Sequence, residues 1–177
     1  MSIEIIPKID AARRQLDTAI SLWFQDGDVV PIHTLTCSAH QIIHDLNRHR
    51  NGPDLLFDSI VVKDEFRHLI KKYLHKDYNF FKHADNDPNG SLEFNPSNTE
   101  QFLLFAILGL EMLGVKSNNL RSTFTIFFAI RHPDLITEKG RESIFQNIPS
   151  EQLDNIRKLN RSQFFKNFNL LLRKTTS

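Results

Sequence analysis

The sequence is poor in cysteine, glycine and proline. Cys37 is the only cysteine among 177 residues, which also include six glycines and seven prolines. A single thiol excludes an internal disulfide and a thiolate-rich zinc site, because both need more than one cysteine in the chain. The scarcity of glycine and proline argues against a loop-rich all-β domain, because both residues are concentrated in turns.

Neither an excess of one charge nor a long apolar run is present. Lys and Arg total 22 against 21 Asp and Glu, so the chain as a whole has no strong field to attract nucleic acid. The most apolar stretch, Phe102 to Leu113, is interrupted by Glu111 and is too short to span a bilayer. The first residues lack the long apolar segment of a secretory signal. The sequence therefore predicts a cytoplasmic protein without a membrane partner.

What the sequence does contain is phenylalanine and helical periodicity. Phe occurs 15 times, against one Trp and two Tyr, so a Phe-rich core or interface is expected. Apolar residues recur three and four positions apart along most of the chain, which indicates amphipathic helices. We expect an all-α fold in a single helical domain, residues 1–177. Residues 9–115 would form a core bundle of four to five main helices, and residues 120–177 would add C-terminal helices.

The expected helix boundaries follow from capping and helix-breaking residues. Gly27 is expected to adopt the left-handed conformation that closes the first helix, and the neighbouring Asp side chains to cap the second. Asn98 or Thr99 is expected to cap the fourth helix, and Ser150 the last. Residues 85–98 read as a long polar loop, and residues 55–62 stay unassigned. The expected helices are residues 9–24, 31–48, 63–84, 99–113, 123–131, 138–146 and 150–173.

Three histidines, His33, His40 and His44, form a stripe that is a candidate metal site. On an α-helix they fall within about 40° of one another, and a His pair four residues apart is a workable pair of ligands. The stripe lies roughly 130° from the centre of the apolar face, so it is expected to face solvent, the edge of a neighbouring helix or a partner subunit. His44 and Asp45 also match the dyad of the HD metal-dependent phosphohydrolases. We expect solvated or hydrogen-bonded histidines here, with no bound metal and no other cofactor.

The main candidate for a catalytic site is the segment NFFKHADNDP, residues 79–88. Asn79 and His83 are four residues apart and share a helix face, with Lys82 beside them. Asp85 and Asp87 follow at once in the polar loop. Such groups can bind phosphate, transfer a proton and orient the group that transfers it. We predict that these five residues line one polar pocket with Lys82 at its rim, and we name all five as candidate catalytic residues.

The same segment has a purely structural interpretation. Lys82 and His83 near a helix C-terminus complement the helix dipole, and Asp side chains in a following loop often bond their own backbone in turns. Under this interpretation the segment caps a helix and carries no chemistry. The sequence leaves both interpretations open.

A helical bundle with a polar Asn and His motif, here NFFKHAD, resembles the HEPN superfamily. The second expected helix, PIHTLTCSAHQIIHDL, is similar to that of many such bundles, and the resemblance covers residues 9–115. The chain also resembles an uncharacterised bacterial all-helical family of this pattern. Active HEPN ribonucleases carry an Arg, four to six residues and then a His, whereas Arg67 and His75 have seven residues between them. The resemblance implies a homodimer with the polar motif at the interface.

The C-terminal segment is basic and aromatic. Between Asn155 and Ser177 there are six Lys or Arg residues and no Asp or Glu, together with Phe164, Phe165 and Phe168. Such a helix can bind RNA or an anionic membrane, or it can dock its apolar side on the bundle and leave its cations in water. We favour docking.

Three functions remain open, and with them the question whether the protein is an enzyme. The first is a dimeric interaction module that binds a second copy or another protein partner. The second is a HEPN-like RNA-binding protein or ribonuclease, and the third is a metal-dependent hydrolase that uses His and Asp. The interaction module makes the fewest demands, because the sequence contains neither the ribonuclease spacing nor a complete set of metal ligands.

Overall fold

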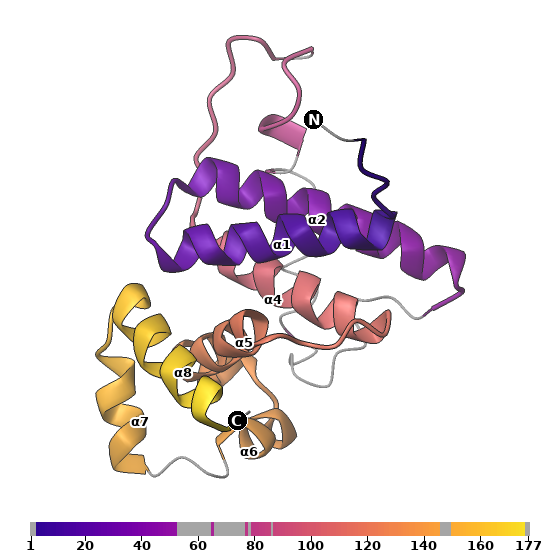
Figure 1. Cartoon of the computed structure of the whole chain (residues 1–177). Coiled ribbons are helices and arrows are strands. Elements are labelled where there is room, and N and C mark those ends of the chain that lie inside the picture. Colours follow the sequence, from indigo (N-terminus) through magenta and orange to yellow (C-terminus); the bar gives the residue numbers. More distant parts are fainter. Residues whose placement is uncertain are drawn as a thin grey trace.

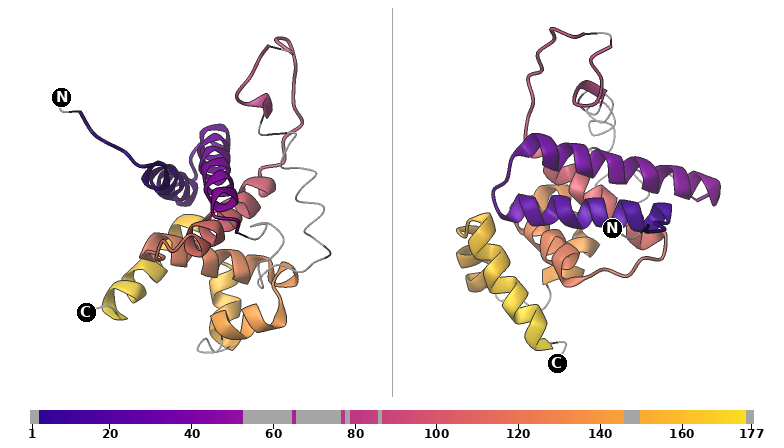
Figure 2. Two further views of the ribbon diagram at one scale, coloured as in Figure 1. Left: turned by 90° about the vertical axis from the view of Figure 1, so that its right-hand side faces the viewer. Right: turned by 45° about the horizontal axis from the view of Figure 1, so that its top comes forward.

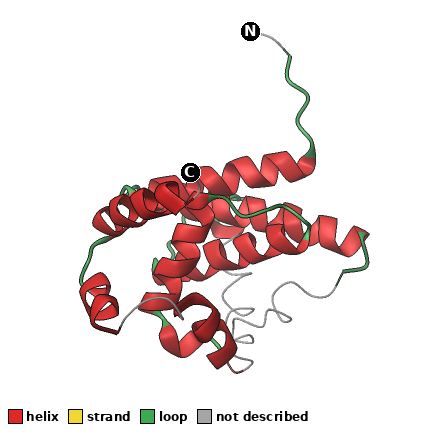
Figure 3. Cartoon of the chain, turned by 60° about the horizontal axis from the view of Figure 1, so that its bottom comes forward, coloured by secondary structure: helices red, strands yellow, loops and turns green. Residues whose placement is uncertain are grey.

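The computed structural model describes residues 3–52, 65, 77, 79–85, 87–145 and 150–175, without the side chains of 150–152 and 169–175. This part of the chain contains seven α-helices, one 3-10 turn and no β-strand (Figure 3), which confirms the all-α prediction. None of these helices is both long enough and apolar enough to cross a membrane. The unassigned segment 55–62 and residues 66–76 of the third expected helix lie outside the described residues.

Helices α1 (Lys8–Phe24) and α2 (Val29–His49) form an antiparallel hairpin (Figure 1). Both helices agree with the apolar periodicity of the sequence, and Asp28 caps α2 by accepting a hydrogen bond of 2.8 Å from the backbone N–H of Val30. α1 buries one stripe against the rest of the bundle, at Ala12, Leu16, Ala19, Ile20, Trp23 and Phe24.

The turn between α1 and α2 differs from the prediction in one respect. Its left-handed residue is Asp26, with a φ of 54°, so the assignment of that conformation to Gly27 was wrong. Asp tolerates this conformation better than most residues, because its short polar side chain can bond locally. Gly27 meets a different need, since a Cβ at this position would lie 3.0 Å from the carbonyl oxygen of Leu22.

Helix α4 (Ser97–Met112) packs against both α1 and α2, and residues 102–107 are all buried. It begins earlier than expected, because the Asn95 side chain accepts a hydrogen bond of 3.0 Å from the backbone N–H of Ser97. Asn98 and Thr99 therefore lie inside the first turn of the helix, and the prediction that one of them caps it was wrong. Both are buried, and their side chains bond to other parts of the fold.

Helix α5 (Asn119–Arg131) also starts before its expected position, because Asn118 caps it through a hydrogen bond of 2.9 Å from the backbone N–H of Arg121. Arg121 is buried and joins α5 to α1 through an ion pair of 3.1 Å with Asp17. A 3-10 turn (Pro133–Leu135) and helix α6 (Glu138–Phe145) follow.

The expected last helix is two helices, α7 (Ser150–Arg157) and α8 (Arg161–Thr175). The break has a local cause in a reciprocal pair of hydrogen bonds. The Asn160 side chain accepts from the backbone N–H of Gln163 at 2.8 Å, and the Gln163 side chain accepts from that of Asn160 at 3.1 Å. This capping box starts a new helix and ends the previous one.

One hydrophobic cluster contains residues from α1, α2, α4, α5 and α8. In this cluster Trp23 of α1 lies edge-on to Phe124 and Phe127 of α5, at ring-centroid distances of 5.0 and 4.9 Å. Phe127 in turn contacts Phe164 of α8 at 4.9 Å, and Phe164 and Phe168 are both buried. These contacts agree with the docking interpretation of the basic, Phe-containing C-terminal segment, and Figure 1 shows α8 lying beside α5.

Candidate functional site

The candidate segment occupies a helix end and the loop that follows it. Asn79 and Phe80 are helical, and the backbone N–H groups of Lys82 and His83 donate to the carbonyl oxygen of Asn79 at 3.2 and 3.1 Å. The helix thus ends before Ala84, its expected last residue. Phe81 turns inward at this point, with its ring 5.1 Å from that of Phe94 on the returning side of the loop.

A tight turn reverses the loop near its tip. The backbone N–H of Gly90 donates to the carbonyl oxygen of Asp87 at 2.8 Å, across the sequence Asp-Pro-Asn-Gly. This sequence suits a type I turn, with Asp first, Pro second and Gly last. A Cβ on Gly90 would lie 2.8 Å from Asp87 Oδ2 and 3.0 Å from the Asp87 carbonyl oxygen, so a glycine suits this position. The turn brings Ser91 and Leu92 back toward Asp85 and Asp87, and Figure 2 shows the loop standing away from the helical body.

Four of the five candidate residues line one hollow of about 620 Å³ between the helix end and this loop. They are Asn79, His83, Asp85 and Asp87, and the other lining residues are Phe80, Ser91 and Leu92. Ser91 and Leu92 were not anticipated, although the Asp-Pro-Asn-Gly turn signal implies that the chain returns here. The shared hollow agrees with the predicted pocket, and the catalytic role of its residues stays a prediction.

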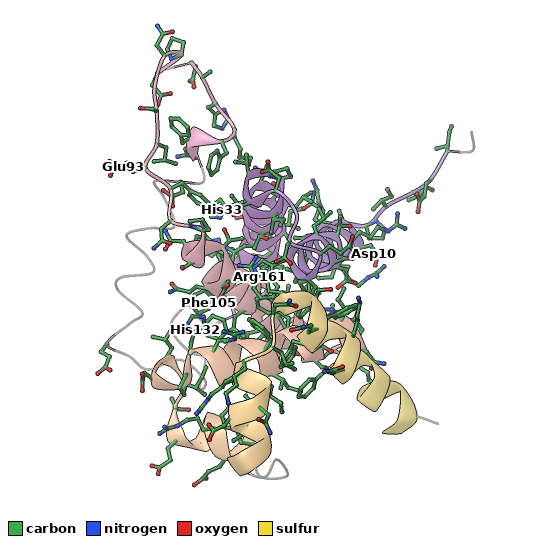
Figure 4. All side chains as sticks on the ribbon, turned by 90° about the vertical axis from the view of Figure 1, so that its left-hand side faces the viewer. Asp10, His33, Glu93, Phe105, His132 and Arg161 are labelled. Carbon is green, nitrogen blue, oxygen red and sulfur yellow. The ribbon has the colours of Figure 1, made fainter. Side chains whose placement is uncertain are left out.

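Lys82 and Glu93 do not line the hollow. The positive charge of Lys82 acts instead on Cys37 of α2, where it lowers the pKa of the thiol against the larger effect of burial. Glu93 of the same loop is exposed and points away from the helices (Figure 4).

The hollow is wet and open, which limits its chemistry. Asn79, His83, Asp85 and Asp87 are all exposed, so water screens the charges that they carry. Such an arrangement can hold a polar ligand through hydrogen bonds. It does not provide the dry, fixed environment in which an enzyme stabilises a developing charge.

A second set of polar groups is buried beneath the loop, where α2 meets the start of α4. His33 Nδ1 lies 3.0 Å from Thr99 Oγ1, and His33 Nε2 lies 3.3 Å from Cys37 Sγ. Nearby, the Asn98 side chain donates to the Asp77 carboxylate at 3.2 Å. All five residues are buried. The rings of Phe81, Phe94 and Phe102 surround His33 edge-on at 5.8, 4.9 and 5.2 Å.

Of the three surroundings expected for the histidine stripe, His33 and His40 face a neighbouring helix and not solvent. Both are buried, and each has an aromatic contact with Phe102 of α4. The helical-wheel estimate assumed one buried face on α2. In the structure α2 packs against α1 on one side and α4 on another, so its buried surface is wider than the apolar residues suggest. His44 is only partly buried.

Burial holds the His33–Cys37 pair in its neutral form. It lowers the pKa of His33 to about 4, although the Asp77 carboxylate opposes the shift, and it raises the pKa of Cys37 to about 12. A neutral imidazole has one donor and one acceptor nitrogen. If the Cys37 thiol donates to His33 Nε2, the proton of the ring is on Nδ1, which then donates to Thr99 Oγ1. The thiolate is the reactive form of cysteine, so this thiol is inert in the folded protein.

The other two histidines of the stripe are His40 and His44. Burial, and to a lesser degree His44, lowers the pKa of His40 to about 4. His40 Nε2 and His44 Nδ1 are buried atoms without a hydrogen-bond partner, and His44 Nδ1 lies 3.5 Å from the Asp45 carboxylate. Among the described residues, no three His, Cys, Asp or Glu side chains are grouped so as to hold one metal ion.

A third polar cluster, which was not predicted from the sequence, joins α8 to the bundle, and Figure 4 labels two of its members, His132 and Arg161. Glu100 of α4 accepts from His132 Nε2 at 2.8 Å and from Arg161 of α8 at 3.4 Å. The Arg161 guanidinium also lies over the Trp23 ring, 4.3 Å from its centroid. These residues are far apart in the sequence and show no spacing pattern that would predict the contact.

Comparison of the chain with protein-family models, with curated proteins and with solved structures finds no match. The resemblance to the HEPN superfamily therefore stays a prediction from the motif alone.

Proposed function

We propose that the protein is a dimeric interaction module, a helical scaffold that acts by binding and not by catalysis. The observation that carries the proposal is the extended segment before α1. Ile3 and Ile5 are 98% and 92% exposed there, and Ile6 is 47% exposed. Single exposed apolar residues are ordinary on soluble proteins. Three isoleucines within four residues, outside the folded body, form an apolar site that gains free energy when a partner covers it.

The state of the titratable groups supports a binding role. The one thiol and two of the helical histidines are buried and neutral, so they serve the packing of α2 against its neighbours. The polar groups of the hollow are exposed to water. A catalytic centre usually combines an accessible reactive group with an environment shielded from water. The buried groups of α2 lack the accessibility, and the exposed groups of the hollow lack the shielding.

The proposal is tested by the mass of the protein in solution. We expect sedimentation velocity at micromolar concentration to give twice the 20.6 kDa of one chain. The apparent mass should fall toward that of the single chain on dilution. A single species of 20.6 kDa throughout the micromolar range would contradict the homodimer.

A second candidate is RNA binding or cleavage at the hollow, favoured by the way Asn79, His83, Asp85 and Asp87 share it. It stands second because two carboxylates on one hollow repel the phosphates of a polyanion. The test compares RNA binding and cleavage by the wild-type chain and by His83→Ala, with circular dichroism to verify the fold. Loss of either activity in a folded His83→Ala protein would support this function, and an unchanged or absent activity would end it. No observation on the described residues favours the metal-dependent hydrolase.

A further inference from the structure

The segment before α1 has the features of an unpaired β-strand. Pro7 at its end is extended, with φ −61° and ψ 151°. Among the described residues no backbone hydrogen bond involves the N–H or C=O groups of residues 3–6. Figures 2 and 3 show the segment leaving the helical body, so both of its edges are open. Isoleucine is among the residues that favour strands, because its branched side chain fits a pleated surface.

The two faces of the segment have different surroundings. Glu4, on one face, forms an ion pair of 2.5 Å with Arg14 of α1, and Ile6 on the same face is half exposed. Ile3 and Ile5, on the other face, touch almost nothing. The ion pair ties the segment to α1 at one point, and Glu4 is the only charged residue from Ile3 to Pro7.

We propose that two copies of this chain pair through residues 3–7, which form an antiparallel two-stranded ribbon about a twofold axis at Ile5. This inference rests on the homodimer proposed above. A twofold contact is self-complementary, so residue i of one chain faces residue j of the other, and residue j faces residue i. An axis at Ile5 places Ile5 opposite Ile5, Glu4 opposite Ile6 and Ile3 opposite Pro7.

Two physical arguments select this register. An axis at Glu4 would place two like charges directly opposite each other, which destabilises a strand pair. Pro7 has no backbone N–H and therefore must occupy a position that does not donate within the ribbon. In the proposed register the backbones of Glu4 in one chain and Ile6 in the other exchange hydrogen bonds. The Ile5–Ile5 pair and the two Ile3–Pro7 pairs then lie at the positions without backbone hydrogen bonds.

The second copy is the occupant that the chemistry favours. A short segment with open edges and alternating side chains pairs best with another extended backbone. The described part of the chain contains no strand that could receive the segment within the same molecule, whereas a second copy supplies an identical segment. A ribbon of two strands is marginal alone, so we expect it to rest on the two α1 helices through the Glu4–Arg14 ion pairs.

The register is tested by cysteine cross-linking in the full chain. Opposed residues at a non-bonded position have Cα atoms about 4.5 Å apart, within the range that a disulfide spans. We expect Ile5→Cys to form an interchain disulfide under mild oxidation. Ile3→Cys is the matched control, because Ile3 is equally exposed but would lie about 13 Å along the ribbon from its copy. The buried thiol of Cys37 is present in both variants and in the wild type, which should not cross-link.

A second variant tests the same contact without cross-linking. Ile5→Asp should raise the dissociation constant of the dimer by roughly tenfold or more, because two apolar side chains are lost and two like charges are opposed. Met112→Gln, which changes an exposed apolar residue on α4, should leave it unaltered.

Each outcome separates the ribbon from the homodimer. A dimer in which Ile5→Cys does not cross-link and Ile5→Asp has no effect would overturn the ribbon and leave the homodimer standing. Cross-linking of both Cys variants to the same extent would overturn the antiparallel register. A chain that stays monomeric at every concentration would overturn both proposals, and would mean that the segment serves a different protein or none.

Discussion

Mild acid should destabilise the fold through two buried histidines of α2. Burial lowers the pKa of His33 and of His40 from 6.5 to about 4. Between these values the unfolded chain binds a proton on each imidazole and the folded chain does not. The free energy of unfolding is therefore greatest above pH 6.5, falls as the pH drops toward about 4, and levels off once both states are protonated.

The expected size of this effect follows from the two pKa values. A change from 6.5 to about 4 corresponds to about 3 kcal/mol for each imidazole. Two such groups together account for about 6 kcal/mol, which is comparable with the total stability of an ordinary domain, about 5–15 kcal/mol. The protein should thus lose much of its stability in a pH range where most carboxylates are still ionised.

The assay is urea unfolding followed by circular dichroism at a series of pH values from neutral to about 4.5. His40→Gln removes one titrating group and should cut the acid-dependent loss of unfolding free energy by about half. His49→Gln is the matched control, because His49 is exposed at the end of the same helix and should not change the loss. The reasoning is refuted if stability is the same at both ends of the series, or if His40→Gln keeps the full loss.

Three further predictions concern other parts of the fold. Cys37 should not react with a thiol reagent in the native protein and should react at once in denaturant, because burial raises its pKa to about 12; rapid native labelling would contradict this. Glu100→Gln should lower the free energy of unfolding by about 1–3 kcal/mol, because it weakens the bonds to His132 and Arg161, and proteolysis should then release the C-terminal helices. Asn160→Ala should cost about 1 kcal/mol in thermal or urea unfolding, through loss of the α8 cap, and Gln163→Ala somewhat less.

The sequence predicts helices well where one apolar stripe and a capping residue agree. α1 and α2 are examples, since the spacing of apolar residues and Asp28 locate both of them. The prediction of one continuous last helix was wrong, although the sequence contains the signal that divides it. Asn160 and Gln163 form a capping box in the sequence, and it divides the last expected helix in two.

The histidines show what periodicity leaves out. A helical wheel places residues relative to one apolar face, but it does not reveal that a helix has two neighbours. α2 packs against both α1 and α4, so His33 and His40 are buried although they stand far from the apolar centre. The partners Thr99 and Asp77 come from distant parts of the chain, and only the fold brings them close to His33.

The candidate pocket was predictable because its members are close in sequence. Asn79 and His83 share one turn of helix, and Asp85 and Asp87 follow in a loop that a Pro-Asn-Gly turn folds back. The position of Lys82 outside the hollow was not predictable from its place beside His83 in the sequence.

Amide hydrogen exchange of residues 4–6 over a series of protein concentrations tests directly whether two chains pair through residues 3–7. If two chains pair through this segment, the amides of Glu4 and Ile6 exchange more slowly as the concentration rises, while the Ile5 amide, which points away from the partner strand, stays fast. Exchange of all three amides at the rate of an unstructured peptide, at every concentration, would contradict the claim.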